Sequence, residues 1–80
     1  MKIEILGQGC SRCRTLEANT REALEELGLD AEIEKVADIA RITAYGVMST
    51  PGMVVDGRVK GSGRIFSREE IVEMLREHEA

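Results

Sequence analysis

Two cysteines three positions apart constrain this chain more than any other feature. Cys10-Ser11-Arg12-Cys13 follows an apolar run from Ile3 to Leu6 and precedes a pattern with helical periodicity. Each helical residue turns about 100°, so side chains three positions apart at the opening of a helix lie on nearly the same face. Their Cα atoms are then close enough for the roughly 4.4 to 6.8 Å that a disulfide requires. We therefore expect a thiol pair that can open and close without rebuilding the fold.

The position of the pair at a helix start predicts which thiol reacts first. The unpaired N–H groups of the first helical turn and the positive end of the helix dipole favour a thiolate at the leading sulfur. Cys10 is thus the expected nucleophile and Cys13 its partner. Arg12 would stabilise the thiolate further by its charge; the alternative is that Arg12 is a solvated residue on an exposed turn.

Composition and charge limit the classes of protein to which this chain can belong. The 80 residues are 42% hydrophobic and 32% charged, which is typical of one small globular domain, expected to span residues 1–80. The net charge of -4, with dispersed Lys and Arg, argues against nucleic-acid binding. There is neither a transmembrane run nor a signal peptide, so we expect a cytoplasmic protein. Two cysteines in a reducing compartment leave catalysis, redox sensing or metal binding.

Hydrophobic spacing predicts seven elements in the order βαβαββα. Alternating or apolar runs indicate four strands, and spacings of three and four indicate three helices. The expected strands are Ile3–Leu6, Leu29–Val36, Gly52–Val55 and Arg58–Gly61. The expected helices start at the cysteine pair and end before Gly28, run from an Asp38 cap to Ala44 or Tyr45, and begin at Ser67.

Topology rules then give an α/β fold with one mixed four-stranded sheet and helices on both faces. Strands one and two are joined by a helix and so become parallel neighbours, whereas Asp56-Gly57 predicts a tight antiparallel hairpin of strands three and four. Charged strands belong at the edges, so the expected order is 2-1-3-4. We expect Ile39 and Ile42 as the apolar contacts of the short helix, and His78 at the solvated end of the last helix.

The motifs together resemble the thioredoxin superfamily over essentially the whole chain. The resemblance rests on the strand, the Cys-x-x-Cys at a helix start, the stretch Gly46 to Pro51 and the hairpin with Asp-Gly. The short length and the Gly-x-Gly-Cys-x-x-Cys opening are similar to small redox-active disulfide proteins of glutaredoxin size. Ser11-Arg12 replaces the Gly-Pro of ordinary thioredoxins.

This resemblance implies a fold, an activity and a site. In the family the Thr-Pro bond is cis and faces the two cysteines, which carries over to Thr50 and Pro51 as substrate-binding residues. Gly9, Ser11 and Arg12 would support the cysteines. The implied activity is thiol-disulfide exchange on protein disulfides, with no cofactor beyond the redox-active pair and with a thioredoxin reductase or similar electron donor. Charged edge strands favour a monomer.

Two other functions fit the same cysteines. Soft metals prefer thiolates, so a copper- or zinc-binding domain or metallochaperone is the alternative. Small metallochaperone domains with a Cys-x-x-Cys between their first strand and first helix run βαββαβ and end on a strand, whereas this chain is expected to end on a helix. Zinc needs about four ligands, and two cysteines with the distant His78 would require two copies of the chain. A regulatory domain whose disulfide only signals redox state is the third possibility.

Met48 and Met53, which flank Pro51, either fill the core or form an adaptable partner surface.

Overall fold

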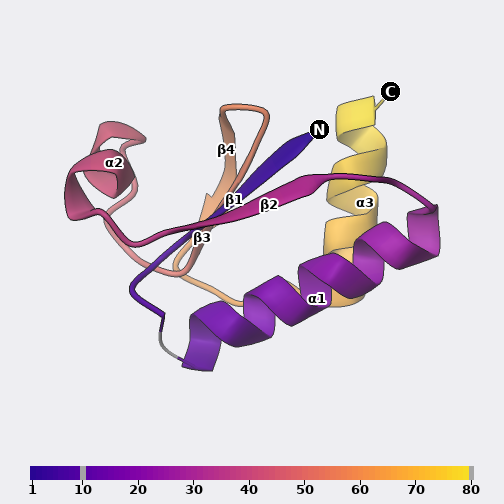
Figure 1. Ribbon diagram of the computed structural model, residues 1–80, viewed down its shortest axis with the longest axis horizontal. Helices are drawn as coiled ribbons and strands as arrows, with labels where there is room; N and C mark the ends of the chain where they lie inside the picture. The colour runs from indigo at the N-terminus through magenta and orange to yellow at the C-terminus, as the bar shows by residue number, and fades with distance from the viewer. Residues whose placement is uncertain (10, 80) are drawn as a thin grey trace.

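The chain forms the seven expected elements in the expected order. The computed structural model describes residues 1–9 and 11–79 (Figure 1). The strands are β1 (Lys2–Leu6), β2 (Glu32–Val36), β3 (Gly52–Val55) and β4 (Arg58–Ser62), and the helices are α1 (Ser11–Leu27), α2 (Ile39–Ala44) and α3 (Arg68–Glu79). Within this described part no helix is both long enough and apolar enough to cross a bilayer.

The sheet has the order β2-β1-β3-β4, which confirms the prediction. β1 runs parallel to β2 and antiparallel to β3, and β3 pairs antiparallel with β4. The charged strands β2 and β4 form the two edges, whereas uncharged β3 lies inside. Edge charges are a common protection against pairing with another chain.

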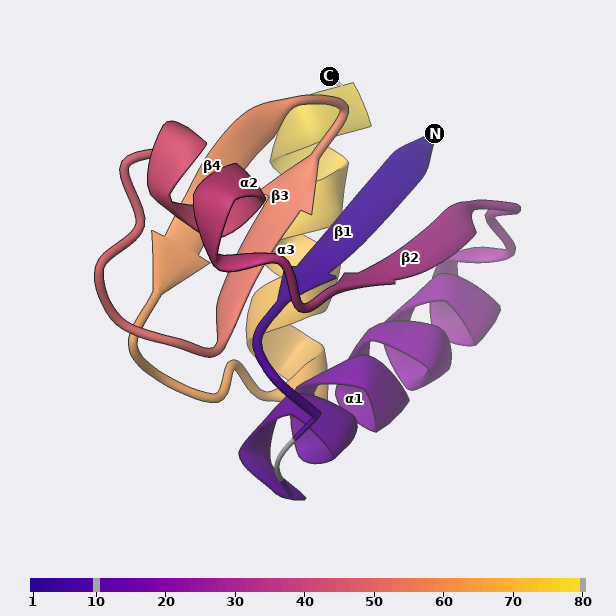
Figure 2. The same ribbon diagram turned by 60° about the vertical axis from the view of Figure 1, so that its left-hand side comes forward.

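Helices cover both faces of the sheet, α1 and α3 on one and α2 on the other (Figures 1 and 2). Because side chains alternate along a strand, β1 contributes to both layers: Ile3 and Ile5 pack in the larger core with α1 and α3, and Leu6 packs in the smaller core with α2. The larger core also contains Leu16, Met53, Phe66, Ile71 and Leu75. The unequal layers leave the α2 side of the sheet only partly covered.

The strand β2 is shorter than predicted. The alternation suggested Leu29–Val36, but the strand begins at Glu32. The preceding residues close α1 instead: Gly28 has a φ of +66°, and the Leu29 N–H donates to the Leu24 carbonyl at 3.0 Å. The remaining boundaries differ from the prediction by one residue, since β1 begins at Lys2 and β4 ends at Ser62.

The hairpin turn organises the end of the molecule where β1 begins and α3 ends. Asp56 and Gly57 have φ values of 49° and 83°, as the predicted turn requires. One Asp56 carboxylate oxygen accepts the Lys2 N–H at 2.8 Å, and the other lies 2.9 Å from the His78 ring. His78 therefore differs from the prediction, because its side chain is only 15% exposed and packs against this carboxylate.

Candidate functional site

The described part of the candidate site begins in the first turn of α1. Cys10 lies outside the described residues and immediately precedes Ser11, where α1 begins. Cys13 is buried, with 5% of its surface exposed. Ser11 and Arg12 are exposed, and Arg12 donates weakly to the Gly63 carbonyl at 3.5 Å. One side of the turn therefore faces solvent, and the other holds a protected sulfur.

Gly7 brings Cys13 close to the loop before β3. The Gly7 N–H donates to the Val36 carbonyl at 2.9 Å, which fixes the chain at the end of β1. A Cβ on Gly7 would overlap the Cys13 sulfur and would lie 3.8 Å from the Cβ of Thr50. Since only a residue without a Cβ fits between these side chains, glycine is required here for close approach.

The loop that contains Thr50 and Pro51 lies at this same end of the sheet. The Thr50–Pro51 peptide bond is cis, Thr50 is exposed, and Pro51 is buried. The Pro51 carbonyl accepts the Gly63 N–H at 2.9 Å, so the segment contacted by Arg12 also supports this loop. The structure thus gathers Arg12, Cys13 and Thr50 around one end of β1. Gly9 lies in the connecting turn with a φ of +77°, a left-handed conformation that favours glycine.

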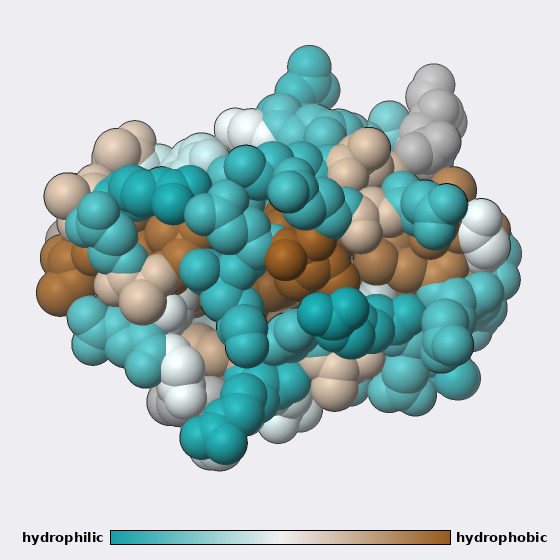
Figure 3. Space-filling model, in the orientation of Figure 1, coloured by the Kyte–Doolittle hydropathy of each residue, from teal (hydrophilic) through white to brown (hydrophobic). Residues whose placement is uncertain are grey.

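An apolar groove of about 660 Å³ adjoins Thr50. It lies between α2 and the loop before β3, and its lining includes Gln8, Ile39, Thr43, Met48 and Thr50. Figure 3 shows apolar surface at the end of the molecule that carries α2. Met48 is 97% exposed and Ile39 is 64% exposed. The prediction that Ile39 packs inside is therefore wrong, because only Ile42 of the short helix turns toward the core.

The two methionines that flank Pro51 have different environments. Met53 is fully buried in the larger core, whereas Met48 projects into solvent beside the groove. The core-filling interpretation thus holds for Met53 and fails for Met48. A flexible, polarisable side chain on the surface is suited to contacts with varied partners.

A buried acid that the sequence pattern did not predict lies in β1. Glu4 is 7% exposed, and the Tyr45 hydroxyl donates to its Oε2 at 2.5 Å. Arg41 Nη2 lies 3.6 Å from its Oε1. The hydrogen bond to Glu4 is the main cause that raises the pKa of Tyr45 above its usual value. The signal was present in the sequence as one carboxylate within an apolar strand.

Glu34 extends this polar cluster toward the surface. Its carboxylate pairs with Lys2 at 3.0 Å and with Arg41 at 2.9 Å. Hydrogen bonds from Arg41 and then Lys2 lower the pKa of Glu34 to about 2. The cluster fastens α2 to the β1–β2 edge of the sheet.

Metal-ligating side chains do not form a cluster in the part of the chain that the structure describes. No group of three or more His, Cys, Asp or Glu side chains with suitable spacing occurs in residues 1–9 and 11–79. His78, the distant ligand considered above, contacts Asp56 at the hairpin.

Comparison with known proteins completes the assignment. The mixed four-stranded sheet of order β2-β1-β3-β4, with α1 and α3 on one face and α2 on the other, defines a thioredoxin-like α/β domain. The chain belongs to the thioredoxin domain family, whose model matches residues 1–76. At the level of that family it is a thiol-disulfide oxidoreductase.

Two relatives carry the name thioredoxin. The protein from Methanothermobacter thermautotrophicus is 49% identical over 75 residues, which cover 94% of this chain and 97% of the relative. The protein from Methanocaldococcus jannaschii is 43% identical over 76 residues, which cover 95% of this chain and 87% of the relative. A solved structure described as that of a malarial protein has a TM-score of 0.71 at 12% identity, covering 99% of this chain and 97% of that one. This last likeness concerns the fold alone.

Proposed function

We propose that this chain reduces disulfides in protein substrates by dithiol-disulfide exchange through Cys10 and Cys13. The observation that supports this most directly is the burial of Cys13 in the first turn of α1, packed against Gly7 at the end of β1. A buried second thiol suits the resolving step, because a bulky partner cannot approach it before the first cysteine has reacted. Membership of the thioredoxin domain family supports the same chemistry.

The proposed exchange has two steps that balance. The Cys10 thiolate attacks one sulfur of the substrate disulfide, which forms a mixed disulfide and releases the other substrate sulfur as a thiolate. The Cys13 thiolate then attacks the Cys10 sulfur and releases the second substrate thiolate. Two electrons pass to the substrate, and the protein is left with a Cys10–Cys13 disulfide.

The environment of the helix start favours the attacking thiolate. The N–H groups of the first turn of α1 and the helix dipole favour a negative charge at this end. Arg12 is exposed and makes only a 3.5 Å contact with a carbonyl oxygen, so its charge is available to a thiolate. We assign Arg12 and Ser11 to support of the reacting sulfur and Gly9 to the turn that leads to it.

Substrate contact is assigned to the loop and the groove beside it. Thr50 is exposed at the edge of the apolar groove, and its backbone groups could pair with an extended segment, as in strand addition. Met48 and Ile39 offer apolar contact next to that segment. A polypeptide substrate fits this surface because it supplies both an extended backbone and apolar side chains.

The remaining partners follow from the same proposal. Turnover requires a reductant for the Cys10–Cys13 disulfide, which we take to be a thioredoxin reductase or a similar electron donor. We further propose that the protein acts in the cytoplasm. We also propose that it is a monomer, since both edge strands of the sheet carry charged side chains.

A trapping experiment tests the two roles. Cys13→Ser should accumulate a mixed disulfide with a protein substrate such as insulin, because the resolving step is lost. Cys10→Ser is the matched control and should form no such adduct. Wild type should reduce insulin catalytically with dithiothreitol as donor, in the presence of a chelator.

The roles would be refuted by two outcomes. If the Cys10→Ser variant formed as much adduct through Cys13 as Cys13→Ser forms through Cys10, the roles of Cys10 as nucleophile and Cys13 as resolving thiol would be refuted. Absence of adducts and of insulin reduction, despite correctly folded protein, would remove the proposed function.

A further inference from the structure

A second hollow reaches the buried cysteine from the side opposite to α2. This cleft of about 390 Å³ lies where the first turns of α1 meet the ends of β1 and β2. Its lining includes Gly7, Gln8, Gly9, Cys13, Arg14 and Lys35. The cleft therefore reaches both Cys13 and Gly9 in the turn that precedes α1. The volume corresponds to on the order of ten water molecules, which suits a small organic molecule.

The charge of the cleft is opposite to that of the whole chain. The protein has a net charge of -4, yet the cleft is lined by Arg14 and Lys35 and by no carboxylate. Within the described residues, Arg14 makes no hydrogen bond or ion pair. Lys35 lies 3.5 Å from Glu17, but that carboxylate is already bound by Arg21 at 2.8 Å. Arg14 therefore keeps its charge available for a ligand, and the Glu17 carboxylate that Lys35 contacts is shared between two cations.

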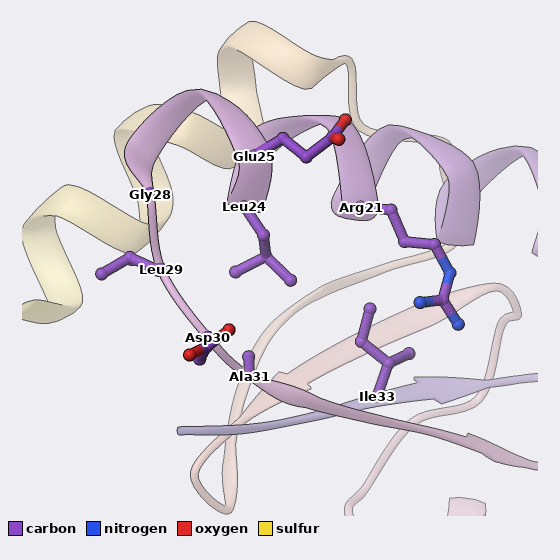
Figure 4. A pocket seen from close by; sticks show the side chains of 8 residues that line it. All are labelled: Arg21, Leu24, Glu25, Gly28, Leu29, Asp30, Ala31 and Ile33. Carbon is purple, nitrogen blue, oxygen red and sulfur yellow. The ribbon is translucent and has the colours of Figure 1, made fainter.

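A neighbouring hollow shows that this charge pattern is local. The junction of α1 and β2 contains another hollow of about 610 Å³ toward the end of α1 (Figure 4). Leu24 and Ile33 project into it, while Arg21, Glu25 and Asp30 lie around it with mixed charges. It contains no cysteine. Among the hollows described, only the cleft at the start of α1 combines positive charge with a thiol.

From this combination we infer that the cleft binds the anionic group of a low-molecular-weight disulfide, so that the protein also reduces small disulfides that carry carboxylates. The inference rests on the proposed function and adds a substrate class to it. The anion lies between Arg14 and Lys35, which orients the attached disulfide toward the cysteine pair. Gly9 leaves room for close approach, because a Cβ at this position would meet open space.

The reaction balances in the same way as the exchange with proteins. The Cys10 thiolate attacks the small disulfide RSSR, forms a Cys10–SR bond and releases RS⁻, which takes up a proton as RSH. The Cys13 thiolate then attacks Cys10, and the second RS⁻ leaves. The small disulfide gains two electrons, and the cysteine pair loses them.

A comparison of substrate charge tests the inference. The rate constant for oxidation of the reduced protein is measured with dithiodipropionate, a dianion, and with 2-hydroxyethyl disulfide, which is neutral. The quantity of interest is the ratio of the two. In the double variant Arg14→Gln, Lys35→Gln, this ratio should fall about three- to tenfold, the effect expected of two exposed charges. Arg58→Gln, at the hairpin end of β4, removes a similar charge far from the cleft and should leave the ratio unchanged.

A binding measurement separates recognition from reaction. The unreactive anion 3-(methylthio)propionate should shift the NMR amide signals of Gly7, Gly9 and Arg14 in a saturable way, and its neutral methyl ester should not. The shifts should weaken with added salt, because exposed charges are screened. Added salt should also lower the dianion-to-neutral rate ratio of the wild type.

Three outcomes decide the matter. An unchanged ratio in the double variant, or the absence of saturable shifts, would overturn the inference. It would also be overturned if the double variant slowed only the reduction of an acidic peptide disulfide, because the cleft would then serve polypeptides. Failure of the proposed function looks different: reduced protein would react with neither small disulfide and would not reduce insulin.

Discussion

At the scale of single residues, the site depends on the absence of a side chain at Gly7. In the sequence, residues 7 to 9 are Gly-Gln-Gly, a pattern typical of a flexible turn. The structure instead gives Gly7 a packing role between the Cys13 sulfur and Thr50. Sequence alone could not show this, because Cys13 and Thr50 are brought to Gly7 only by the folded sheet. Gly9, by contrast, is a turn glycine with a positive φ.

The variant Gly7→Ala should therefore displace Cys13. We expect the free energy of unfolding to fall by roughly 1–3 kcal/mol, as for overpacked cores, and the Cβ chemical shift of Cys13 to change. Gly28→Ala is the control: its Cβ would meet open space, but its φ of +66° makes alanine costly by roughly 1–2 kcal/mol. That variant should be destabilised without a change at Cys13. An unaltered Cys13 signal in Gly7→Ala would contradict the packing role.

The contact of Tyr45 with Glu4 can be tested by titration of the tyrosine absorbance, because the chain has one tyrosine and the signal belongs to that residue. The pKa of Tyr45 is raised above 10.0 mainly by its hydrogen bond to Glu4. Because the folded-state pKa exceeds that of the unfolded chain, the stabilisation is complete below pH 10.0 and disappears as pH rises through the folded-state value. Absorbance titration should give a midpoint above 10.0 in wild type and a lower one in Glu4→Gln. A wild-type midpoint of 10.0 would contradict the contact.

At the scale of elements, local sequence signals predicted the ends of helices better than the ends of strands. The helix expected to begin at Ser67 starts with a capping box: the Glu70 N–H donates to Ser67 Oγ at 3.1 Å, and the Ser67 N–H donates to Glu70 Oε1 at 3.0 Å. A cap is formed by neighbours in sequence. The start of β2 was missed because alternation continues into Leu29, whereas pairing with β1 begins only at Glu32.

Removal of the cap should destabilise the protein through α3. We expect Ser67→Ala to lower the free energy of unfolding by about 1 kcal/mol, measured by urea denaturation. Ser67→Asp keeps an oxygen acceptor for the Glu70 N–H and should recover most of the loss. Equal destabilisation by both substitutions would indicate that the cap is not responsible.

The ion pairs of Glu34 should make the attachment of α2 sensitive to acid. The pKa of Glu34 is lowered from 4.5 to about 2 by Arg41 and Lys2. A depressed folded-state pKa gives a stabilisation that is present above pH 4.5 and lost as pH falls through about 2. The difference in thermal midpoint between wild type and Glu34→Gln should therefore shrink over this pH range. Glu25→Gln, which removes a carboxylate without an ion pair among the described residues, should show no such trend. A constant difference for Glu34→Gln would contradict the assignment.

At the scale of the whole molecule, the sequence predicted topology because the rules that determine it act on order and periodicity. One helical crossover makes β1 and β2 parallel, one tight hairpin makes β3 and β4 antiparallel, and edge charges determine the order. The same rules could not predict the surfaces beside Thr50 and Cys13. The groove beside Thr50 and the cleft beside Cys13 each combine residues from separate elements. Their shape and charge emerge only when the sheet brings those elements together.

The midpoint potential of the Cys10–Cys13 couple tests the central claim most directly. The protein is equilibrated across a dithiothreitol series with a chelator present. Thiol alkylation followed by mass measurement then gives the fractions of oxidised and reduced protein. A reductant of protein disulfides should show one two-electron transition near or below about -250 mV. A transition near about -150 mV would instead indicate an oxidant or isomerase. Failure to form an intramolecular disulfide at any point of the series would contradict the account.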